Sequence, residues 1–309
     1  MFLSGQAIAQ GCSDAGFCTM GAMKPDQAYS KKINFKLRSI ELSYYKGTTK
    51  TTTDIFVTNL DVSFGLTQKT GIQVKLPYQW TDGNLGKAAG LGDISLSVTH
   101  NLHSFKNFEL NATVGMKIPS NNSDIRSQGR NRPLSIGLVL PMYNQISLGS
   151  WDIVAGASLI NEKWLLAVGY QNALTANNNT FKQSDWAPPV YPSEGYIALY
   201  DEATKLKRGS DVMLRLERNF KFARYSFNLG LLSIYRISKD QIIDDVTNEY
   251  KKLEGTTGLA LTALLGVGYN ININNTVKFT YGKKLTDREV NPDGLTREEV
   301  MIVAYLFRF

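Results

Sequence analysis

Two histidines are the residues that most directly suggest catalysis. His100 and His103 lie close together in VTHNLHS, and a histidine placed beside a serine or cysteine can act as the base that activates it. The chain has no GxSxG motif, no phosphate-binding loop motif and no His-rich zinc pattern. The sequence therefore favours a protein that is not an enzyme, with no catalytic residue and no cofactor.

Paired carboxylates are the second arrangement that suggests chemistry. Asp211 and Glu217 could divide acid and base work between them in a cleft. Arg215 shares their alternation in DVMLRLE, however, and a guanidinium between two carboxylates is typical of a salt-bridged interior. We interpret these three residues as structural ion pairs.

Sulfur-bearing residues gather near the start of the chain. Cys12 and Cys18 are the two cysteines, and Met20 and Met23 follow them. In an oxidising compartment the cysteines would form a local disulfide, which is the arrangement we predict. Free thiols are an alternative, and four soft donors would suit Cu(I), but no histidine is nearby and we predict no metal site.

Composition excludes several classes of protein. The net charge of +7 over 309 residues comes from lysines and arginines scattered among acids, whereas nucleic-acid binding needs a basic cluster. No apolar run approaches the ~20 residues of a transmembrane helix. The chain is therefore soluble or a β-barrel, in which the membrane-spanning signal is hidden in alternation.

Alternation of apolar and polar residues recurs along the chain. In 71–80 the even positions are apolar or aromatic, and Gln73 and Lys75 lie between them, as expected of a strand with one face in lipid. The first strand changes phase around Ser39, which a bulge explains. The segment 133–148, with two prolines, is expected to be a loop. Twelve strands are predicted, near 33–46, 54–66, 70–80, 91–103, 107–118, 150–160, 162–173, 208–219, 222–236, 257–273, 276–285 and 297–309.

The connections between these strands alternate between short and long. Short connections lie near 67–69, 104–106, 161, 220–221 and 274–275, and longer ones at 47–53, 81–90, 119–149, 174–207, 237–256 and 286–296. Outer-membrane barrels have short periplasmic turns, long external loops and an even number of strands. The fold class predicted is an all-β, antiparallel up-and-down transmembrane barrel.

Aromatic residues lie where the strands should cross the membrane interfaces. Trp164 and Tyr170 are six residues apart on one face, or about 20 Å along a strand, close to the ~25 Å height of a barrel's apolar band. The last strand ends in an aromatic stripe that resembles the C-terminal signal for insertion of outer-membrane barrels. Its residues are Tyr305, Phe307 and Phe309.

Charged residues on the opposite parity are expected to line the lumen. Unpaired charges in a narrow interior would cost several kcal/mol each, so they should pair or be hydrated. The network could leave a narrow polar pore, or it could close the lumen. The predicted lumen residues are Glu41, Asp61, Lys75, Asp93, Glu109, Lys117, Asp211, Arg215, Glu217, Lys278 and Arg308.

The N-terminal residues are not expected to contribute a strand to the barrel wall. Residues 1–10 resemble the tail of a signal peptide, with Ala7 and Ala9 as a small-x-small cleavage site, although an ordinary disordered N-terminus is an alternative. Residues 11–32 would form a periplasmic segment that either plugs the barrel or lies as a tail. Residues 33–309 would form a single barrel.

Several short stretches resemble a known family of transporters. GLGDISLSV (90–98) resembles the GxGD-type strand start of outer-membrane transporters of the MetA-pathway-of-phenol-degradation type, and SWDIVAGASL, KWLLAVGYQ, RGSDVMLRLE and VAYLFRF fit the same porin-like class. The resemblance implies a channel for hydrophobic solutes with an N-terminal plug. The charged lumen departs from an apolar conduit.

We therefore predict a channel or transporter for small, possibly hydrophobic solutes in the outer membrane of a Gram-negative bacterium. The alternative is a structural or interaction barrel with a sealed lumen, part of an outer-membrane assembly. Expected partners are the lipid bilayer with its lipopolysaccharide, the barrel-insertion machinery and an envelope protein, but no nucleic acid.

Overall fold

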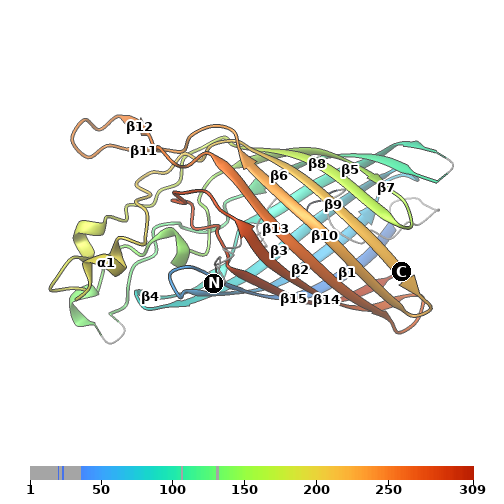
Figure 1. The fold of residues 1–309 in the computed structure, drawn as a ribbon, viewed down its shortest axis with the longest axis horizontal. Coiled ribbons are helices and arrows are strands. Elements are labelled where there is room, and N and C mark those ends of the chain that lie inside the picture. The colour runs from blue at the N-terminus through green and yellow to red at the C-terminus, as the bar shows by residue number, and fades with distance from the viewer. Residues whose placement is uncertain (1–19, 21–22, 24–35, 106, 130–131) are drawn as a thin grey trace, which may run out of the picture.

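The computed structural model describes residues 20, 23, 36–105, 107–129 and 132–309. The predicted disulfide between Cys12 and Cys18 lies outside these residues. Twelve antiparallel strands form a closed barrel (Figure 1). They are β1 (Lys36–Thr48), β2 (Asp54–Gly65), β3 (Thr70–Gly83), β5 (Ile94–Ser104), β6 (Glu109–Ile118), β7 (Asp152–Ile160), β8 (Trp164–Ala173), β9 (Asp211–Phe222), β10 (Tyr225–Arg236), β13 (Gly258–Asn270), β14 (Asn275–Thr286) and β15 (Glu299–Arg308).

Each barrel strand pairs with the next barrel strand along the chain, and β15 pairs with β1 to close the cylinder. The closing register runs from Ser39 opposite Arg308 to Thr48 opposite Glu299. Closure removes the exposed edges that an open sheet would present. The predicted fold class is confirmed. The bulge predicted near Ser39 is also present, as a register shift between Leu37 and Ser39 against β2.

The two faces of each strand differ in exposure. In β8, Leu166 and Val168 are 41% and 48% exposed, whereas Leu165 and Ala167, which alternate with them, are 2% and 1% exposed. The exposed face of the barrel is rich in large apolar side chains, and the buried face carries most of the charged and polar ones. An apolar exterior around a polar interior is the pattern of a transmembrane barrel.

Some strand boundaries differ from those predicted. The predicted loop 81–90 contains the end of β3 and β4 (Gly86–Leu91), which pair as a hairpin, and the predicted loop 237–256 contains β11 (Gln241–Ile243) and β12 (Tyr250–Lys252). β9 begins at residue 211 rather than 208, because the backbone N–H of Gly209 donates to Asp240 instead of to a ladder. The β9–β10 turn lies at 223–224 rather than at the predicted 220–221.

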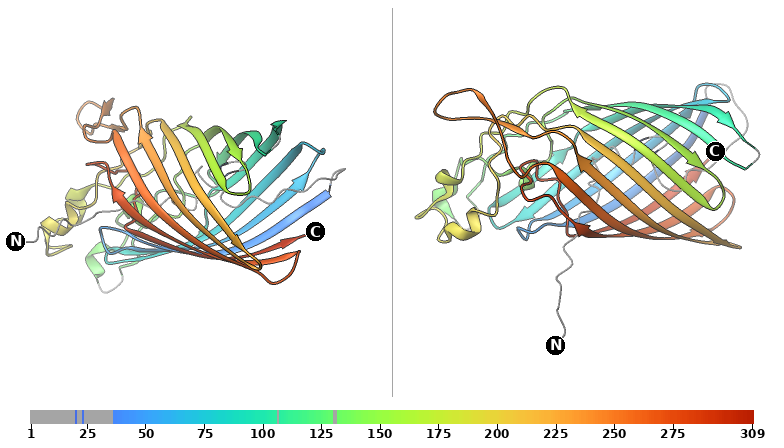
Figure 2. Two further views of the ribbon diagram at one scale, coloured as in Figure 1. Left: turned by 45° about the vertical axis from the view of Figure 1, so that its right-hand side comes forward. Right: turned by 45° about the horizontal axis from the view of Figure 1, so that its top comes forward.

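One end of the barrel has short turns and the other has long loops (Figures 1 and 2). At the short-turn end the connections are residues 66–69, 105–108, 161–163, 223–224 and 271–274, and the C-terminus lies there too (Figure 1). Aromatic pairs lie at both ends of the outer face. Tyr225 and Tyr269 are 5.1 Å apart near the short turns, and Phe56 and Trp80 are 5.5 Å apart towards the long loops.

The long-loop end is covered by loops that have an apolar core of their own. Short helices lie in these loops: α1 (Glu194–Ile197) and 3-10 turns at Pro133–Ser135, Met142–Asn144 and Gln183–Trp186. No helix among the described residues is long and apolar enough to cross a membrane. We call the folded loops 119–151 and 174–210 the cap. Its core contains Val139, Leu140, Tyr143, Phe181, Trp186, Tyr191, Ile197 and Tyr200, and Leu85 from the turn between β3 and β4 packs with them.

Candidate functional site: the barrel interior and its mouth

A row of charged residues, two acids followed by a lysine, crosses the interior wall formed by β1, β2 and β3. Glu41 is opposite Asp61, and Asp61 is opposite Lys75, so the three side chains are neighbours on one face. Lys278 from β14 approaches Glu41 at 3.5 Å, and Gln73 donates to Asp61 at 2.7 Å. Each acid therefore faces a cation or an amide, as burial of charge requires.

The remaining predicted lumen residues near the middle and the short-turn end also have partners. Arg215 binds Glu217 at 2.5 Å, and both are buried. Arg308 donates to Thr276 at 2.8 Å, near the short-turn end. Glu109, at the start of β6, is half-buried. The structural interpretation of Arg215 and Glu217 as an ion pair is therefore the one that the geometry favours over acid–base catalysis.

A loop segment lies across the long-loop end of the interior. Residues 139–150, which we call the mouth segment, are buried almost without interruption. Gln79 and Thr81, from the interior face of β3, donate to the carbonyls of Gln145 and Asn144 at 2.9 and 3.0 Å. The side chain of Ile146, in the same segment, lies against Gly90 of β4. A Cβ at Gly90 would lie 2.7 Å from the end of that side chain. The mouth segment therefore narrows the entrance to the barrel.

Asp93 joins the mouth segment to the barrel wall. Its carboxylate accepts hydrogen bonds from the Ser147 hydroxyl and, at 2.9 Å, from the backbone N–H of Leu148. The same carboxylate pairs with Lys117 at 3.4 Å, and both side chains are 1% exposed. The hydrogen bonds from Ser147 and Leu148 therefore fasten the segment to a carboxylate that Lys117 keeps in place, and removal of either charge would leave the other buried.

A second buried network ties the later loops to the ends of β9 and β10. Arg236 pairs with Asp211 and Asp240 at 2.8 Å and with Asp293 at 2.9 Å. Arg288 pairs with Asp293 at 3.3 Å and with Asp240 at 3.6 Å. Because Asp240 and Asp293 belong to different loops, Arg236 fastens both loops to the barrel.

The two loop carboxylates of this network have opposite pKa shifts. Burial raises the pKa of Asp240 despite the attraction of Arg236. Burial acts in the same direction on Asp293, but there Arg288 and Arg236 outweigh it and hold its pKa well below the usual range. The network therefore keeps Asp293 ionised and places any proton that it takes up on Asp240.

Arg208 forms a third buried contact, beside the mouth segment. Its guanidinium pairs with Asp152 and donates to Ser150 at 3.1 Å, while Gln171 donates to Asp152 at 2.5 Å. Sequence reasoning missed Arg208, Asp152 and Arg236 as interior residues. Asp152 and Arg236 have the interior parity of β7 and β10 and could have been found from it.

One part of the interior wall is apolar. Val154, Leu165, Ala167, Met213 and Leu232 form a buried cluster on β7 to β10, and Met20 and Met23 pack against it. The two methionines are 3% and 0% exposed. A Cβ built on the interior Gly115 would lie 3.1 Å from the sulfur of Met20. Met20 and Met23 therefore lie inside the barrel.

Both histidines lie at the short-turn end of β5. The Nδ1 of His100 is 2.8 Å from the hydroxyl of Thr70, and the ring of His103 packs edge-on against Phe105. Among the residues that the structure describes, no group of three His, Cys, Asp or Glu side chains could hold a metal ion.

Comparison with known proteins finds similarity in structure but not in sequence. No family model and no curated protein matches the chain. The fold is similar to the COG4313 outer membrane channel from Pseudomonas putida F1, with a TM-score of 0.58 and 14% identity over 92% of this chain and 99% of that one. The NanC porin (TM-score 0.49, 9% identity, 89% and 100% covered) and the CymD monoaromatic hydrocarbon channel (0.41, 10%, 92% and 90%) are more distant. The chain therefore has the fold of an outer-membrane channel.

Proposed function

We propose that this protein is an outer-membrane channel for small solutes in a Gram-negative bacterium. The observation that carries the proposal is the polar, ion-paired interior of a closed barrel whose exterior is apolar. A barrel of twelve strands is wider than the side-chain-filled barrels of eight strands. The long-loop end faces outwards and the short-turn end faces the periplasm.

The resemblance to transporters of the MetA-pathway-of-phenol-degradation type extends the proposal to hydrophobic solutes. The apolar cluster around Val154 and Leu165 supports it, because it gives the interior one wall on which an apolar solute can lie. Met20 and Met23 occupy that wall, which supports a role of residues 11–32 as a plug rather than a tail. The charged residues on the other walls orient water and polar groups.

Conductance across a planar bilayer tests the channel. We expect small conductance steps from the purified protein and larger ones after the mouth segment is shortened by replacing 142–147 with two glycines. A matched control shortens the β11–β12 hairpin at 244–249, which leaves the barrel interior unchanged and should leave conductance unchanged. Absence of conductance from both shortened proteins, at either polarity, would contradict a channel and favour the sealed structural barrel.

Solute selectivity is a separate measurement. Proteoliposomes should take up a monoaromatic acid faster than a disaccharide of the same concentration, and Leu165→Asp should reduce the difference, because it places a charge on the apolar wall. Equal uptake of both solutes by the two proteins would contradict a hydrophobic substrate while leaving the channel itself intact.

The C-terminal stripe supports recognition by the barrel-insertion machinery. Tyr305, on the outer face of β15, and Phe309, which follows the strand, are 44% and 56% exposed at the short-turn end. Phe309→Ser should slow assembly in cells, measured as the fraction of protein that resists protease in intact outer membranes. The matched control is Tyr78→Ser, because Tyr78 is an exposed aromatic residue at the other end of the outer face.

A further inference from the structure

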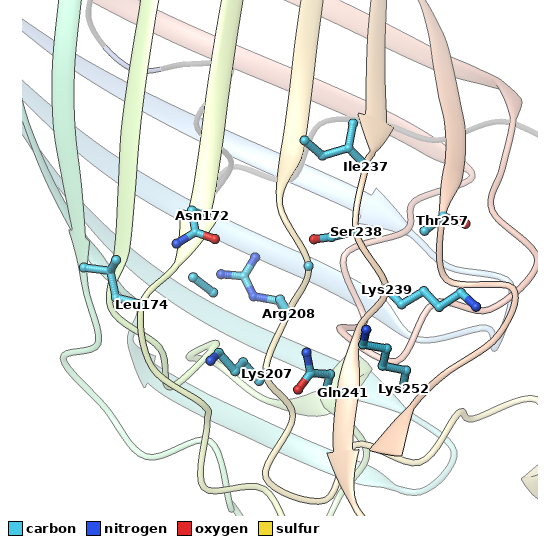
Figure 3. Close-up of a pocket in the computed structure, with 12 residues that line it drawn as sticks. Asn172, Leu174, Lys207, Arg208, Ile237, Ser238, Lys239, Gln241, Lys252 and Thr257 are labelled. Carbon is cyan, nitrogen blue, oxygen red and sulfur yellow. The ribbon is translucent and has the colours of Figure 1, made fainter. Parts of the chain in front are cut away.

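A cationic cavity lies outside the solute pathway described above. Its volume is about 600 Å³, and it lies between the ends of β8, β9 and β10 and the β11–β12 hairpin. Four cationic side chains line it, from Lys207, Arg208, Lys239 and Lys252 (Figure 3). No aspartate or glutamate is among the described residues that line it. The cavity therefore suits an anion.

Strand pairing directs two of the lysines to one side. Lys207 and Gln241 form an antiparallel bridge with N–O distances of 2.8 and 2.9 Å, and Gln241 is opposite Lys252 in the β11–β12 ladder. Directly opposed residues of a sheet project from the same face. Lys207 and Lys252 are two strands apart, or about 10 Å, so one bound group can lie between their amines.

No acid among the described residues neutralises the charges of Lys207 and Lys252. Arg208 is paired with Asp152, and Lys239 is paired with Glu254 at 2.5 Å. Neither Lys207 nor Lys252 forms an ion pair with another described residue, and both are exposed. Two positive charges are thus available to a ligand.

The edge of the cavity nearest the barrel strands is apolar and belongs to the outer face of the barrel. Leu174 and Ile237 line it and are 52% and 51% exposed. They continue the exposed rows of β8 and β10, in which Tyr170 and Tyr235 are the last aromatic residues. Tyrosines mark the level of the lipid headgroups, so the cavity, which begins two to four residues further along these strands, lies at the outer side of the headgroups.

We propose that this cavity binds the phosphate group of an anionic lipid headgroup, with the less polar part of the headgroup lying against Leu174 and Ile237. Lys207 and Lys252 supply the charge, and the apolar edge favours a lipid over a free anion. The proposal rests on the proposed membrane location of the barrel. It does not depend on conductance, so a barrel that fails to conduct can still bind the lipid.

Native mass spectrometry of the full chain in neutral detergent tests this site. The probe is bisphosphorylated lipid A, with phosphatidylcholine as the uncharged comparison and inorganic phosphate as a competitor. We expect Lys207→Gln with Lys252→Gln to weaken lipid A retention about 30-fold, since each lysine near an anionic lipid contributes about a factor of five. Lys207→Arg with Lys252→Arg should retain binding.

The matched control removes two exposed lysines at the short-turn end, by Lys163→Gln with Lys221→Gln. It changes the net charge equally and should leave lipid A retention unchanged. Equal losses in the two glutamine pairs, or no loss from the Lys207 and Lys252 pair, would overturn the site. Displacement of lipid A by an equal concentration of inorganic phosphate would overturn its assignment to a lipid.

Discussion

Asp93 and Lys117 offer the sharpest test of how the mouth of the barrel is held. The pair is 3.4 Å apart with both side chains 1% exposed. Asp93→Asn leaves a buried ammonium whose one remaining acid, Asp152 on the neighbouring strand, is already paired with Arg208, and this costs about 3–5 kcal/mol of the free energy of unfolding. Lys117→Met leaves a buried carboxylate that still accepts from Ser147 and Leu148, so its cost should fall at the lower end of that range.

The double variant Asp93→Asn with Lys117→Met separates the charge pair from simple packing. Neutral groups of similar volume should cost about 1 kcal/mol together, because the exchange of a buried ion pair for uncharged groups is often close to neutral. The coupling energy that these costs imply is about 5 kcal/mol or more, measured by urea unfolding in detergent micelles. Costs that add to within about 0.5 kcal/mol would refute the reasoning.

The same variants should change conductance in a defined order. Asp93→Asn leaves the mouth segment with a weaker acceptor for two of its donors, so we expect a larger and noisier conductance than in the native protein. The double variant should behave similarly, because it also lacks the carboxylate, although its stability is restored. Native conductance from both proteins would show that Asp93 does not hold the segment.

Three further outcomes are expected at the long-loop end. Arg236→Met should cost about 3–5 kcal/mol and expose the loops on either side to protease, measured by limited trypsinolysis; native resistance would contradict a fastening role. Trp186→Ala should cost about 3–5 kcal/mol within the cap, seen as an earlier melting step that leaves the barrel transition unchanged. Asp244 has a pKa lowered to about 2 by its hydrogen bond from Lys251 and from two backbone N–H groups; its stabilisation of the hairpin should be complete above about pH 4 and lost as the pH falls towards 2. A spin label at Val246, with Cys12 and Cys18 replaced by serine, should become more mobile over that range.

Strand alternation explains why most of the fold could be predicted from the sequence. A period of two assigns every residue of a strand to one face, so Lys75 and Arg215 could be assigned to the buried face before any contact was known. The bulge at Ser39 was visible for the same reason, because it shifts that period.

The mouth segment could not be predicted in this way. Residues 139–150 are buried almost without interruption and without a period, and their partners on the barrel wall lie 54 to 66 residues away. Asp240 and Asp293 are loop residues with no pattern to distinguish them from exposed acids. Their burial depends on Arg236, whose own position is set by the closed barrel.

The contacts of the mouth segment have a consequence for the order of assembly. The segment binds β3 on one side, and on the other its Met142 and Leu148 pack with Leu206, Ile242 and Leu295 from three later connections. These groups surround the rim, and only a finished cylinder holds them at the required separations. Contacts between such distant parts of a chain form late, after the loops that they close. We therefore expect the mouth segment to dock onto the rim as the last step of assembly. An intermediate that precedes this step should have a higher conductance than the mature protein.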